Sequence, residues 1–241
     1  MRIILADNYE EMSKKAAAIV RNQIILKPDC VLGLATGDTP IGMYKELIKM
    51  HDNKEVDFSE VTTFNLDEYC KLNRENTQSY YYYMNHNFFK YINAKKENTY
   101  IPNGAAQDID EECRNYERQI KNKGGIDLQV LGIGANGHIG FNEPDIKFKA
   151  ETHLVKLDKM TIEANSRFFS SKDEVPTTAI SMGIETIMKS RMIVLLANGE
   201  IKADAIYKTV KGKMCPEVPA SIIQLHPNAT MIIEKNAAKL L

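Results

Sequence analysis

The residues GIGANGHIGFNEP, at positions 132–144, place one imidazole and one carboxylate in a glycine-rich segment. His138 stands between glycines, and an imidazole that titrates near neutral pH is the usual proton shuttle of enzymes. Glu143 follows five residues later and could fold back to orient the ring. We therefore expect acid–base chemistry from this segment, and a tight loop without a chemical role is the alternative.

The same segment opens with the pattern G-x-G-x-x-G, formed by Gly132, Gly134 and Gly137. In a dinucleotide-binding fold a helix starts at the last glycine, and its N-terminus holds the pyrophosphate. Asp158 stands at about the spacing of the ribose-binding acid. However, Pro144 and the absence of an apolar period argue against a helix after Gly137. The pattern therefore disfavours a dinucleotide site.

A second polar stretch, TGDTP at 36–40, ends an apolar run and begins a helical pattern. We expect Thr39 to be the N-cap and Pro40 to be the first helical residue. Backbone N–H groups at a helix N-terminus suit a phosphate. The candidate phosphate ligands here are Thr36, Gly37, Asp38 and Thr39. A capped turn without a ligand is the alternative, and the absence of G-K-[ST] excludes a nucleoside-triphosphate P-loop.

A third stretch, NLDEY at 65–69, places the carboxylates of Asp67 and Glu68 at the end of a predicted strand. A carboxylate in a partly desolvated site is a good base for carbon acids. An N-cap or a surface pair fits the pattern equally well. Two candidate cations, Arg167 in ANSRFF and Lys202 at the start of a helical pattern, are each typical of a surface charge when taken singly.

Apolar runs that alternate with helical patterns must position these residues. The predicted strands span residues 2–6, 30–36, 61–69, 126–133, 152–157, 191–197 and 229–234. The predicted helices span residues 9–26, 40–50, 76–92, 109–122 and 199–210. The alternation predicts an α/β fold: one three-layer, doubly wound domain over residues 1–241 with a mostly parallel, Rossmann-like sheet. Ligands of such folds bind at the carboxyl ends of strands, where the polar stretches lie.

Composition limits the kind of partner. The 241 residues are 44% hydrophobic and 26% charged, with a net charge of −1. No global basic field exists, so we expect neither nucleic acid nor a membrane as a partner. The N-terminus lacks a secretory signal, no apolar run is long enough to span a membrane, and the cysteines form no C-x-x-C pair. We expect a cytoplasmic protein with reduced thiols and no metal site.

Taken together, the motifs resemble those of the glucosamine-6-phosphate deaminases, which convert glucosamine 6-phosphate and water to fructose 6-phosphate and ammonia. The resemblance covers nearly the whole chain in order: LATGDTP (34–40), TFNLDEY (63–69), SYYYYMNHNFF (79–89), GIGANGHIGFNEP (132–144), ANSRFF (164–169), Lys202 and LHP (225–227). GxxGHIxFNEP together with FNxDEY is highly specific for these enzymes, whereas TGxTP alone is not.

The resemblance implies a role for each matching residue. Asp67 would be the base that moves a proton between carbons 1 and 2 of the opened sugar. His138 would open the pyranose ring as an acid–base group, and Glu143 would support and orient it. The TGDTP loop, Arg167 and Lys202 would hold the phosphate of the sugar, with Arg167 in a segment that acts as a mobile lid in the family. Neither a metal nor a cofactor is implied.

Some positions depart from the family pattern. Many members have Asp where this chain has Asn136, which can orient the imidazole but cannot stabilise an imidazolium by charge, so we expect Glu143 to carry more of that role. Asp38 replaces a small residue, and its carboxylate is expected to point away from a phosphate. His153 and Val155 stand where longer, hexameric members carry basic residues of an activating site. We therefore expect a monomer or small homo-oligomer without that activation.

Three alternatives stay open. A 6-phosphogluconolactonase-type hydrolase shares the fold and the phosphate loop but does not need the carboxylate of FNLDEY. An isomerase that acts on an aminosugar phosphate and retains the nitrogen is distinguished from the deaminase only by the family match. A non-catalytic sugar-phosphate sensor domain usually lacks the base and the histidine, and it carries an N-terminal DNA-binding helix pair. Residues 1–30 here predict one strand and one helix instead.

Overall fold

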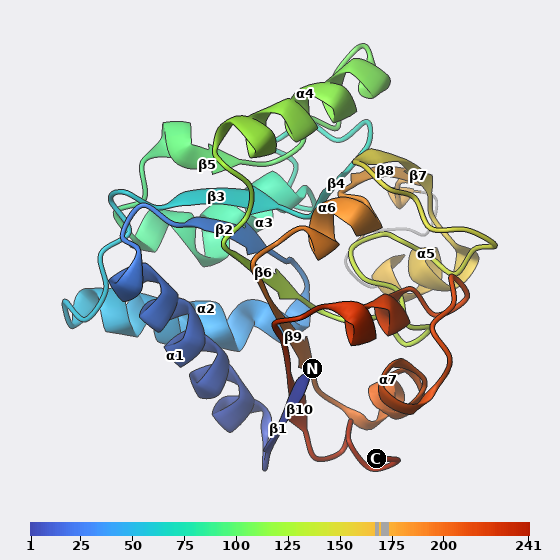
Figure 1. The fold of residues 1–241 in the computed structure, drawn as a ribbon. Coiled ribbons are helices and arrows are strands. Elements are labelled where there is room, and N and C mark those ends of the chain that lie inside the picture. The colour runs from blue at the N-terminus through green and yellow to red at the C-terminus, as the bar shows by residue number, and fades with distance from the viewer. Residues whose placement is uncertain (167–168, 170–173) are drawn as a thin grey trace.

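The computed structural model describes residues 1–166, 169 and 174–241, and a seven-stranded sheet forms its centre (Figure 1). In spatial order the strands are β1 (Arg2–Ala6), β10 (Ala229–Glu234), β9 (Met192–Ala197), β6 (Leu128–Leu131), β2 (Val31–Leu34), β3 (Thr62–Asn65) and β5 (Thr99–Tyr100). Neighbouring strands in this sheet are parallel. The architecture confirms the predicted doubly wound α/β fold.

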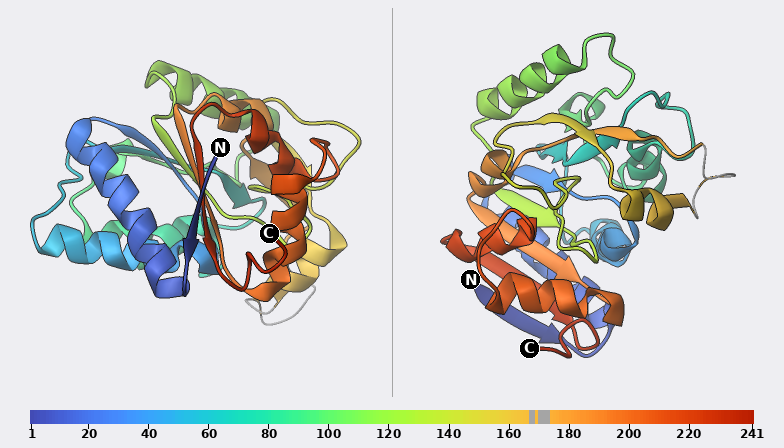
Figure 2. Two further views of the ribbon diagram at one scale, coloured as in Figure 1. Left: turned by 60° about the horizontal axis from the view of Figure 1, so that its bottom comes forward. Right: turned by 90° about the vertical axis from the view of Figure 1, so that its right-hand side faces the viewer.

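Helices cover both faces of the sheet (Figure 2). One face carries α1 (Tyr9–Leu26), α2 (Asp38–Asp52), α3 (Tyr80–Asn87) and the short 3-10 helix η1 (Phe89–Tyr91). The other carries α4 (Ile109–Asn122), α6 (Ile184–Met188), α7 (Ala203–Lys211) and the 3-10 helix η5 (Pro219–Leu225). The other helices within the described residues are η2 (Lys96–Asn98), α5 (Lys159–Ser166) and η4 (Glu200–Lys202). None of the helices described combines the length and apolar composition needed to cross a membrane.

Local sequence explains where α1 begins and ends, as predicted. The side chain of Asn8 caps the helix by accepting a hydrogen bond from the backbone N–H of Glu11 at 2.9 Å. The helix gives way at Lys27, because the residue before a proline is disfavoured in helical conformation. Its buried residues recur every three or four positions: Met12, Ser13, Ala16, Ala17, Val20 and Ile24. This stripe packs α1 into the core.

A three-stranded antiparallel sheet is the main feature that the sequence did not predict. It contains β4 (Asp67–Tyr69), β8 (Thr178–Ser181) and β7 (His153–Lys156), in that order. The predicted strand 61–69 divides at Leu66, whose N–H donates to the carbonyl of Leu34 at 3.0 Å. Its first half therefore stays in the large sheet, and its second half enters the small one. The predicted strand 152–157 also belongs to the small sheet.

Three predicted helices differ in extent from the structure, and the one predicted at 40–50 spans Asp38–Asp52 as α2. The predicted helix 76–92 contains only α3, because residues 76–79 form turns and the hydroxyl of Ser79 caps the helix by accepting from the N–H of Tyr82 at 3.0 Å. After α3 the chain tightens into η1. The helix predicted at 199–210 begins as η4 and continues as α7.

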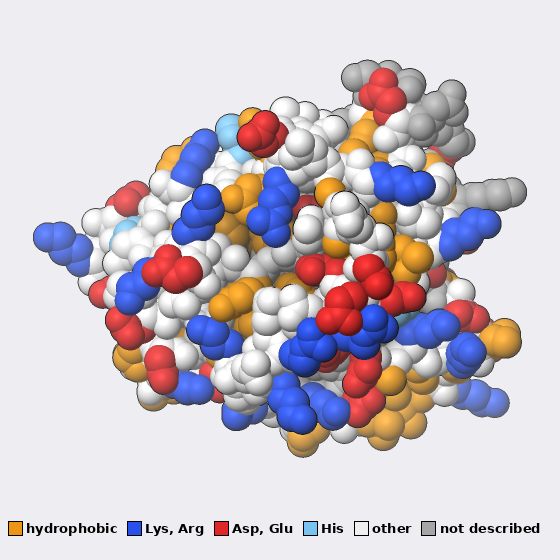
Figure 3. Space-filling view, turned by 90° about the horizontal axis from the view of Figure 1, so that it is seen from above, with side chains coloured by type: hydrophobic (Ala, Val, Ile, Leu, Met, Phe, Trp, Pro, Cys, Tyr) orange, Lys and Arg blue, Asp and Glu red, His pale blue; other side chains and the backbone are white. Residues whose placement is uncertain are grey.

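Charged side chains of both signs lie beside each other on the α4 side of the molecule (Figure 3).

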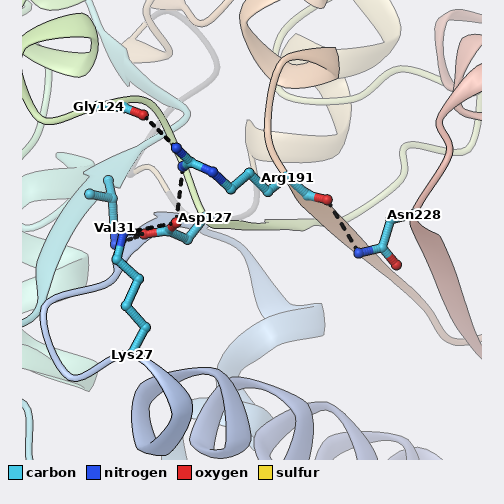
Figure 4. Close-up of polar contacts among 6 residues, drawn as sticks. All are labelled: Lys27, Val31, Gly124, Asp127, Arg191 and Asn228. Atoms are coloured by element: carbon cyan, nitrogen blue, oxygen red, sulfur yellow. Dashed lines mark hydrogen bonds and ion pairs between the residues drawn. The ribbon is translucent and has the colours of Figure 1, made fainter.

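A buried carboxylate joins four segments at the amino-terminal edge of the large sheet (Figure 4). Asp127, which is 4% exposed, accepts hydrogen bonds from Nζ of Lys27 at 2.8 Å and from Nη1 of Arg191 at 2.9 Å. It also accepts from the backbone N–H of Val31 at 2.8 Å. The end of α1 and the starts of β2, β6 and β9 are thereby held together.

Replacing this carboxylate should destabilise the fold. In Asp127→Asn the amide no longer pairs with two cations, so the free energy of unfolding should fall by about 2–3 kcal/mol. Urea unfolding followed by circular dichroism measures the loss. The control Glu10→Gln removes the exposed ion pair with Lys14 and should leave the midpoint unchanged. Equal midpoints for Asp127→Asn and the wild type would contradict the role given to Asp127.

Candidate active site

The predicted polar stretches meet where the sheet changes its direction of growth. From β2 the order proceeds through β3 to β5, whereas β6 lies on the other side of β2 and is followed by β9. The loops that follow β2 and β6 therefore leave adjacent strand ends toward opposite faces. Doubly wound folds bind ligands at this switch point. Here the two loops contain TGDTP (36–40) and GIGANGHIGFNEP (132–144).

The loop at 132–144 holds His138 and Glu143 together. Nδ1 of His138 lies 3.2 Å from Oε2 of Glu143, and the two side chains are 22% and 11% exposed. This Nδ1 atom is buried and makes no well-aligned hydrogen bond with any described residue, so the two groups are close but not in hydrogen-bonding geometry. A β-carbon on Gly134 would lie 2.3 Å from Cε1 of His138, so glycine makes room for the ring. Turns rather than a helix follow Gly137, as predicted.

Asn136 acts on the imidazole through Glu143 and the backbone. Its Nδ2 donates to Oε2 of Glu143 at 2.9 Å, and its Oδ1 accepts from the N–H of His138 at 3.2 Å. The other carboxylate oxygen of Glu143, Oε1, accepts a hydrogen bond from the hydroxyl of Thr161. Burial raises the pKa of Glu143, but His138, Thr161 and Asn136 together lower it below its ordinary value. Glu143 is therefore a carboxylate at neutral pH.

Asp67 is a buried carboxyl group against the same loop. It is 6% exposed and lies on β4, where it pairs with Ser181 of β8. Gly140, in the loop, has a φ of 58°, and a β-carbon placed there would lie 3.5 Å from Oδ2 of Asp67. Burial, and then the charge of Glu68, raise the pKa of Asp67 to about 8. Asp67 is thus a stronger base than an ordinary carboxylate.

Glu68 is buried as well and has a different environment. It is 3% exposed and accepts hydrogen bonds from three backbone N–H groups, those of Tyr69 at 2.9 Å, Tyr80 at 2.8 Å and Tyr81 at 2.9 Å. Burial raises the pKa of Glu68 to about 7 in spite of these donors. A surface pair, one interpretation of the sequence, is wrong for both carboxylates. The N-cap interpretation is wrong as well, because both residues lie in β4 and Ser79 is the N-cap of α3. Glu68 instead accepts from the first-turn N–H groups of α3 as a contact between distant segments.

The loop after β2 differs from the prediction. α2 begins at Asp38, and its N-cap is Gly37, with a φ of 93° and no side-chain cap. Thr39 is therefore not the N-cap, and Pro40 is not the first helical residue. Glycine adopts this positive φ without steric cost, so the backbone alone starts the helix. The hydroxyl of Thr39 instead donates to Oδ1 of Asn198 at 2.8 Å, which joins this loop to the end of β9.

The remaining predicted phosphate ligands lie near that junction, as far as the structure describes them. Thr36 is half-buried in the loop, and the hydroxyl of Tyr83 donates to the carbonyl of Gly37 at 2.6 Å. Lys202 is half-buried at the end of η4, four residues beyond Asn198. Arg167 lies outside the described residues, so its place beside the phosphate stays a prediction.

Aromatic rings pack beside Asp67. The ring of Tyr69 lies 4.8 Å from that of Tyr80, 5.5 Å from that of Phe141 and 6.0 Å from that of Phe169, measured between centroids. Because Tyr69 lies two positions after Asp67 on β4, these rings are on the same side of the strand as Asp67. Within the described residues, no group of three or more His, Cys, Asp and Glu side chains is placed to hold a metal ion. Sequence patterns did not point to Thr161, whose hydroxyl donates to Glu143, or to Ser181, which pairs with Asp67.

Fold and site together define a doubly wound α/β protein with an acid–base site at the switch point of its sheet. A family model described as glucosamine-6-phosphate isomerases/6-phosphogluconolactonase matches residues 6–232. The chain belongs to this family.

Individual relatives are similar over the whole chain. The glucosamine-6-phosphate deaminase of Clostridium botulinum is 64% identical over 241 residues, which are 100% of this chain and 99% of that protein. The enzyme of the same name from Clostridium acetobutylicum is 63% identical, with 100% of both chains covered. The solved structure of a monomeric glucosamine-6-phosphate deaminase matches with a TM-score of 0.98 and 46% identity over 100% of both chains.

More distant structures share the fold alone. The 6-phosphogluconolactonase of Thermotoga maritima superposes with a TM-score of 0.75 at 17% identity, covering 97% of this chain and 99% of that one. At this identity the likeness concerns the architecture and does not bear on the reaction.

The raised pKa of Asp67 predicts a pH dependence of stability. The folded protein keeps the Asp67 proton up to about pH 8, whereas the unfolded chain releases it near the ordinary value of 3.8. The resulting stabilisation is complete below the ordinary value and is lost as the pH rises through about 8. Asp67→Asn, which does not titrate, should therefore gain stability relative to the wild type between pH 5 and pH 8, by on the order of 1 kcal/mol or more.

Urea midpoints of both proteins at the two pH values measure this gain. Asp204→Asn, which replaces an exposed partner of Lys208, serves as a control whose difference from the wild type should not change in that interval. A constant difference between Asp67→Asn and the wild type would show that the pKa of Asp67 is not raised.

Proposed function

We propose that this chain is an enzyme that converts glucosamine 6-phosphate and water to fructose 6-phosphate and ammonia. Relatives that are 63–64% identical over the full chain carry the name of this activity. The observation that carries the proposal is the placing of the His138–Glu143 pair and of Asp67 against one loop at the switch point. Two separate acid–base groups are what ring opening followed by proton transfer requires.

His138 opens the pyranose ring in this proposal. Because Nδ1 faces Glu143, Nε2 is the nitrogen that exchanges a proton with the anomeric hydroxyl and the ring oxygen. The carboxylate of Glu143 supports the imidazole when it carries the proton. Asn136 contributes by holding Glu143, since its amide has no charge to offer.

Asp67 then acts on the open aldehyde, whose carbon-2 proton is acidic. Its carboxylate removes this proton while the aldehyde oxygen takes up a proton from the neighbouring ammonium group, which gives an enolamine. The proton held by Asp67 then returns to carbon 1 and leaves an iminium at carbon 2. Water adds to carbon 2, and the carbon–nitrogen bond breaks to release ammonia and fructose 6-phosphate. The oxidation state of the sugar is unchanged overall, so the reaction needs no redox cofactor. A base with a pKa near the working pH is suited to such a step.

The phosphate of the substrate would bind between the β2 and β9 loops. Thr36, Gly37, Asp38 and Thr39 would offer backbone N–H groups at the start of α2, and Lys202 and Arg167 would offer positive charge. The hydrogen bond from Thr39 to Asn198 supports this proposal, since it joins the two loops. Asp38 is exposed, and its carboxylate is expected to point away from the phosphate.

The site favours deamination over lactone hydrolysis and over ligand sensing. A lactone hydrolase needs no base for a carbon-bound proton, and a sensor domain needs no proton relay, whereas Asp67 and His138 provide both functions. The monomeric relative, 46% identical, supports a monomer or small homo-oligomer. A family match over residues 6–232 supports one domain over the whole chain. Independence from metals and cofactors, the lack of nucleic-acid and membrane partners, and a cytoplasmic location stay predictions.

Purified protein should release ammonia and fructose 6-phosphate from glucosamine 6-phosphate without added cofactor or metal. His138→Gln and Asp67→Asn should each lower kcat by roughly 10²–10⁴-fold, because each removes one acid–base group. Coupled assays of ammonia and of fructose 6-phosphate measure both products. His86→Gln, on the exposed side of α3, is the matched control and should keep wild-type activity.

Three results would contradict the proposal. Ammonia release that persists in both variants would remove the roles of these residues. Isomerisation without ammonia would indicate an isomerase that retains its nitrogen. Folded wild-type protein that hydrolyses 6-phosphogluconolactone but leaves glucosamine 6-phosphate unchanged would indicate the lactonase reaction.

A further inference from the structure

One hydrogen bond links the α5 helix to the proposed acid–base pair. The hydroxyl of Thr161, the third residue of α5, donates to Oε1 of Glu143 across a sequence separation of 18 positions. Thr161 is buried, with 6% of its surface exposed. A buried threonine hydroxyl that donates to a carboxylate is a charge-assisted hydrogen bond, which is stronger than one between neutral groups.

The two oxygen atoms of Glu143 are held from different parts of the chain. Oε2 accepts from Asn136, which belongs to the same loop as Glu143, and faces Nδ1 of His138. Oε1 is held by Thr161, which belongs to α5. Both donors are needed to fix the plane of the carboxylate, because with Asn136 alone the group can rotate about its last bond. The plane decides how Oε2 faces the imidazole.

The approach between Glu143 and His138 is sensitive to this plane. Nδ1 of His138 is 3.2 Å from Oε2 but is not aligned as a good hydrogen bond. A small rotation of the carboxylate therefore decides whether the imidazole is held in a productive orientation. Catalytic hydrogen bonds are often long or poorly aligned without substrate and tighten in the complex.

The segment that carries Thr161 is itself anchored beside the site. Ile162, the next residue, packs against the hydrophobic cluster formed by Tyr69, Phe141, Val155, Leu157 and Ala179. The same cluster borders Asp67, which lies two positions before Tyr69 on β4. Packing of Ile162 next to Asp67 therefore fixes the position of α5. The hydrogen bond from Thr161 links that position to the orientation of Glu143.

We propose that Thr161 is a positioning residue for ring opening: its hydroxyl sets the orientation of Glu143, and through it that of His138, so that α5 must be in place for the imidazole to work. This inference rests on the proposed function. It assigns to Thr161 an effect on the His138 step and none on the Asp67 step.

Thr161→Val removes the hydroxyl at nearly constant volume and tests the inference. The kcat for glucosamine 6-phosphate should fall about 10- to 100-fold with little change in KM, because the imidazole is misplaced while the substrate still binds. With substrate deuterated at carbon 2, the isotope effect on kcat should fall toward unity, because ring opening becomes slower than removal of that hydrogen. Thr161→Ser, which keeps the hydroxyl, should restore both values.

Two matched measurements separate positioning from general damage. Thr186→Val removes a buried threonine hydroxyl that donates to Glu117 at 2.7 Å away from the site, and it should leave kcat and the isotope effect unchanged. Without any substrate, the ¹⁵N NMR signals of the His138 ring should differ between Thr161→Val and the wild type and match in Thr161→Ser.

A wild-type kcat in Thr161→Val would overturn the inference, as would a loss of kcat with an undiminished isotope effect. Unchanged ring signals of His138 in Thr161→Val would also overturn it. Failure of the proposed function is a different result: the wild type then releases no ammonia, while the NMR comparison still reports whether Thr161 positions the imidazole.

Discussion

The site depends on the burial of two adjacent carboxyl groups at the point where the chain leaves the large sheet and enters the small one. Asp67 and Glu68 point to opposite sides of β4, because side chains alternate along a strand. Glu68 receives three backbone N–H donors and holds the start of α3, whereas burial and the neighbouring charge dominate at Asp67. Two like residues thereby acquire different tasks from their environments, one structural and one as a base.

The division of the chain at Leu66 makes this arrangement possible. If residues 61–69 formed one strand of the parallel sheet, Asp67 would continue in line with β3 and would not pair with Ser181. The antiparallel sheet instead carries it against Gly140, in the loop that also holds His138. The loop that carries the proposed ring-opening group therefore also contacts the proposed base. Two of its glycines leave room for these groups, Gly134 for the imidazole and Gly140 for the carboxyl group.

The sequence predicted elements whose limits are decided locally. The helix 109–122 and the strand 229–234 match the structure at both ends, since Asp108 caps the helix and most residues of the strand are apolar. The sequence did not predict contacts between distant segments, namely the small sheet and the hydrogen bond from Thr161 to Glu143. It also misplaced the start of α2, where the positive φ of Gly37 begins the helix without a side-chain cap. Residue types predicted a sugar-phosphate site with a histidine and carboxylates, and the reaction itself came from the resemblance to a family.

The most direct test of Asp67 as a single, shielded base is to follow the hydrogen that it moves. Glucosamine 6-phosphate deuterated at carbon 2 is converted under single-turnover conditions in ordinary water, and the fructose 6-phosphate is analysed by NMR. Because Asp67 is 6% exposed and flanked by aromatic rings, part of the deuterium should appear at carbon 1 of the product. Product without any deuterium at carbon 1, even at the shortest times, would contradict transfer by one buried carboxyl group.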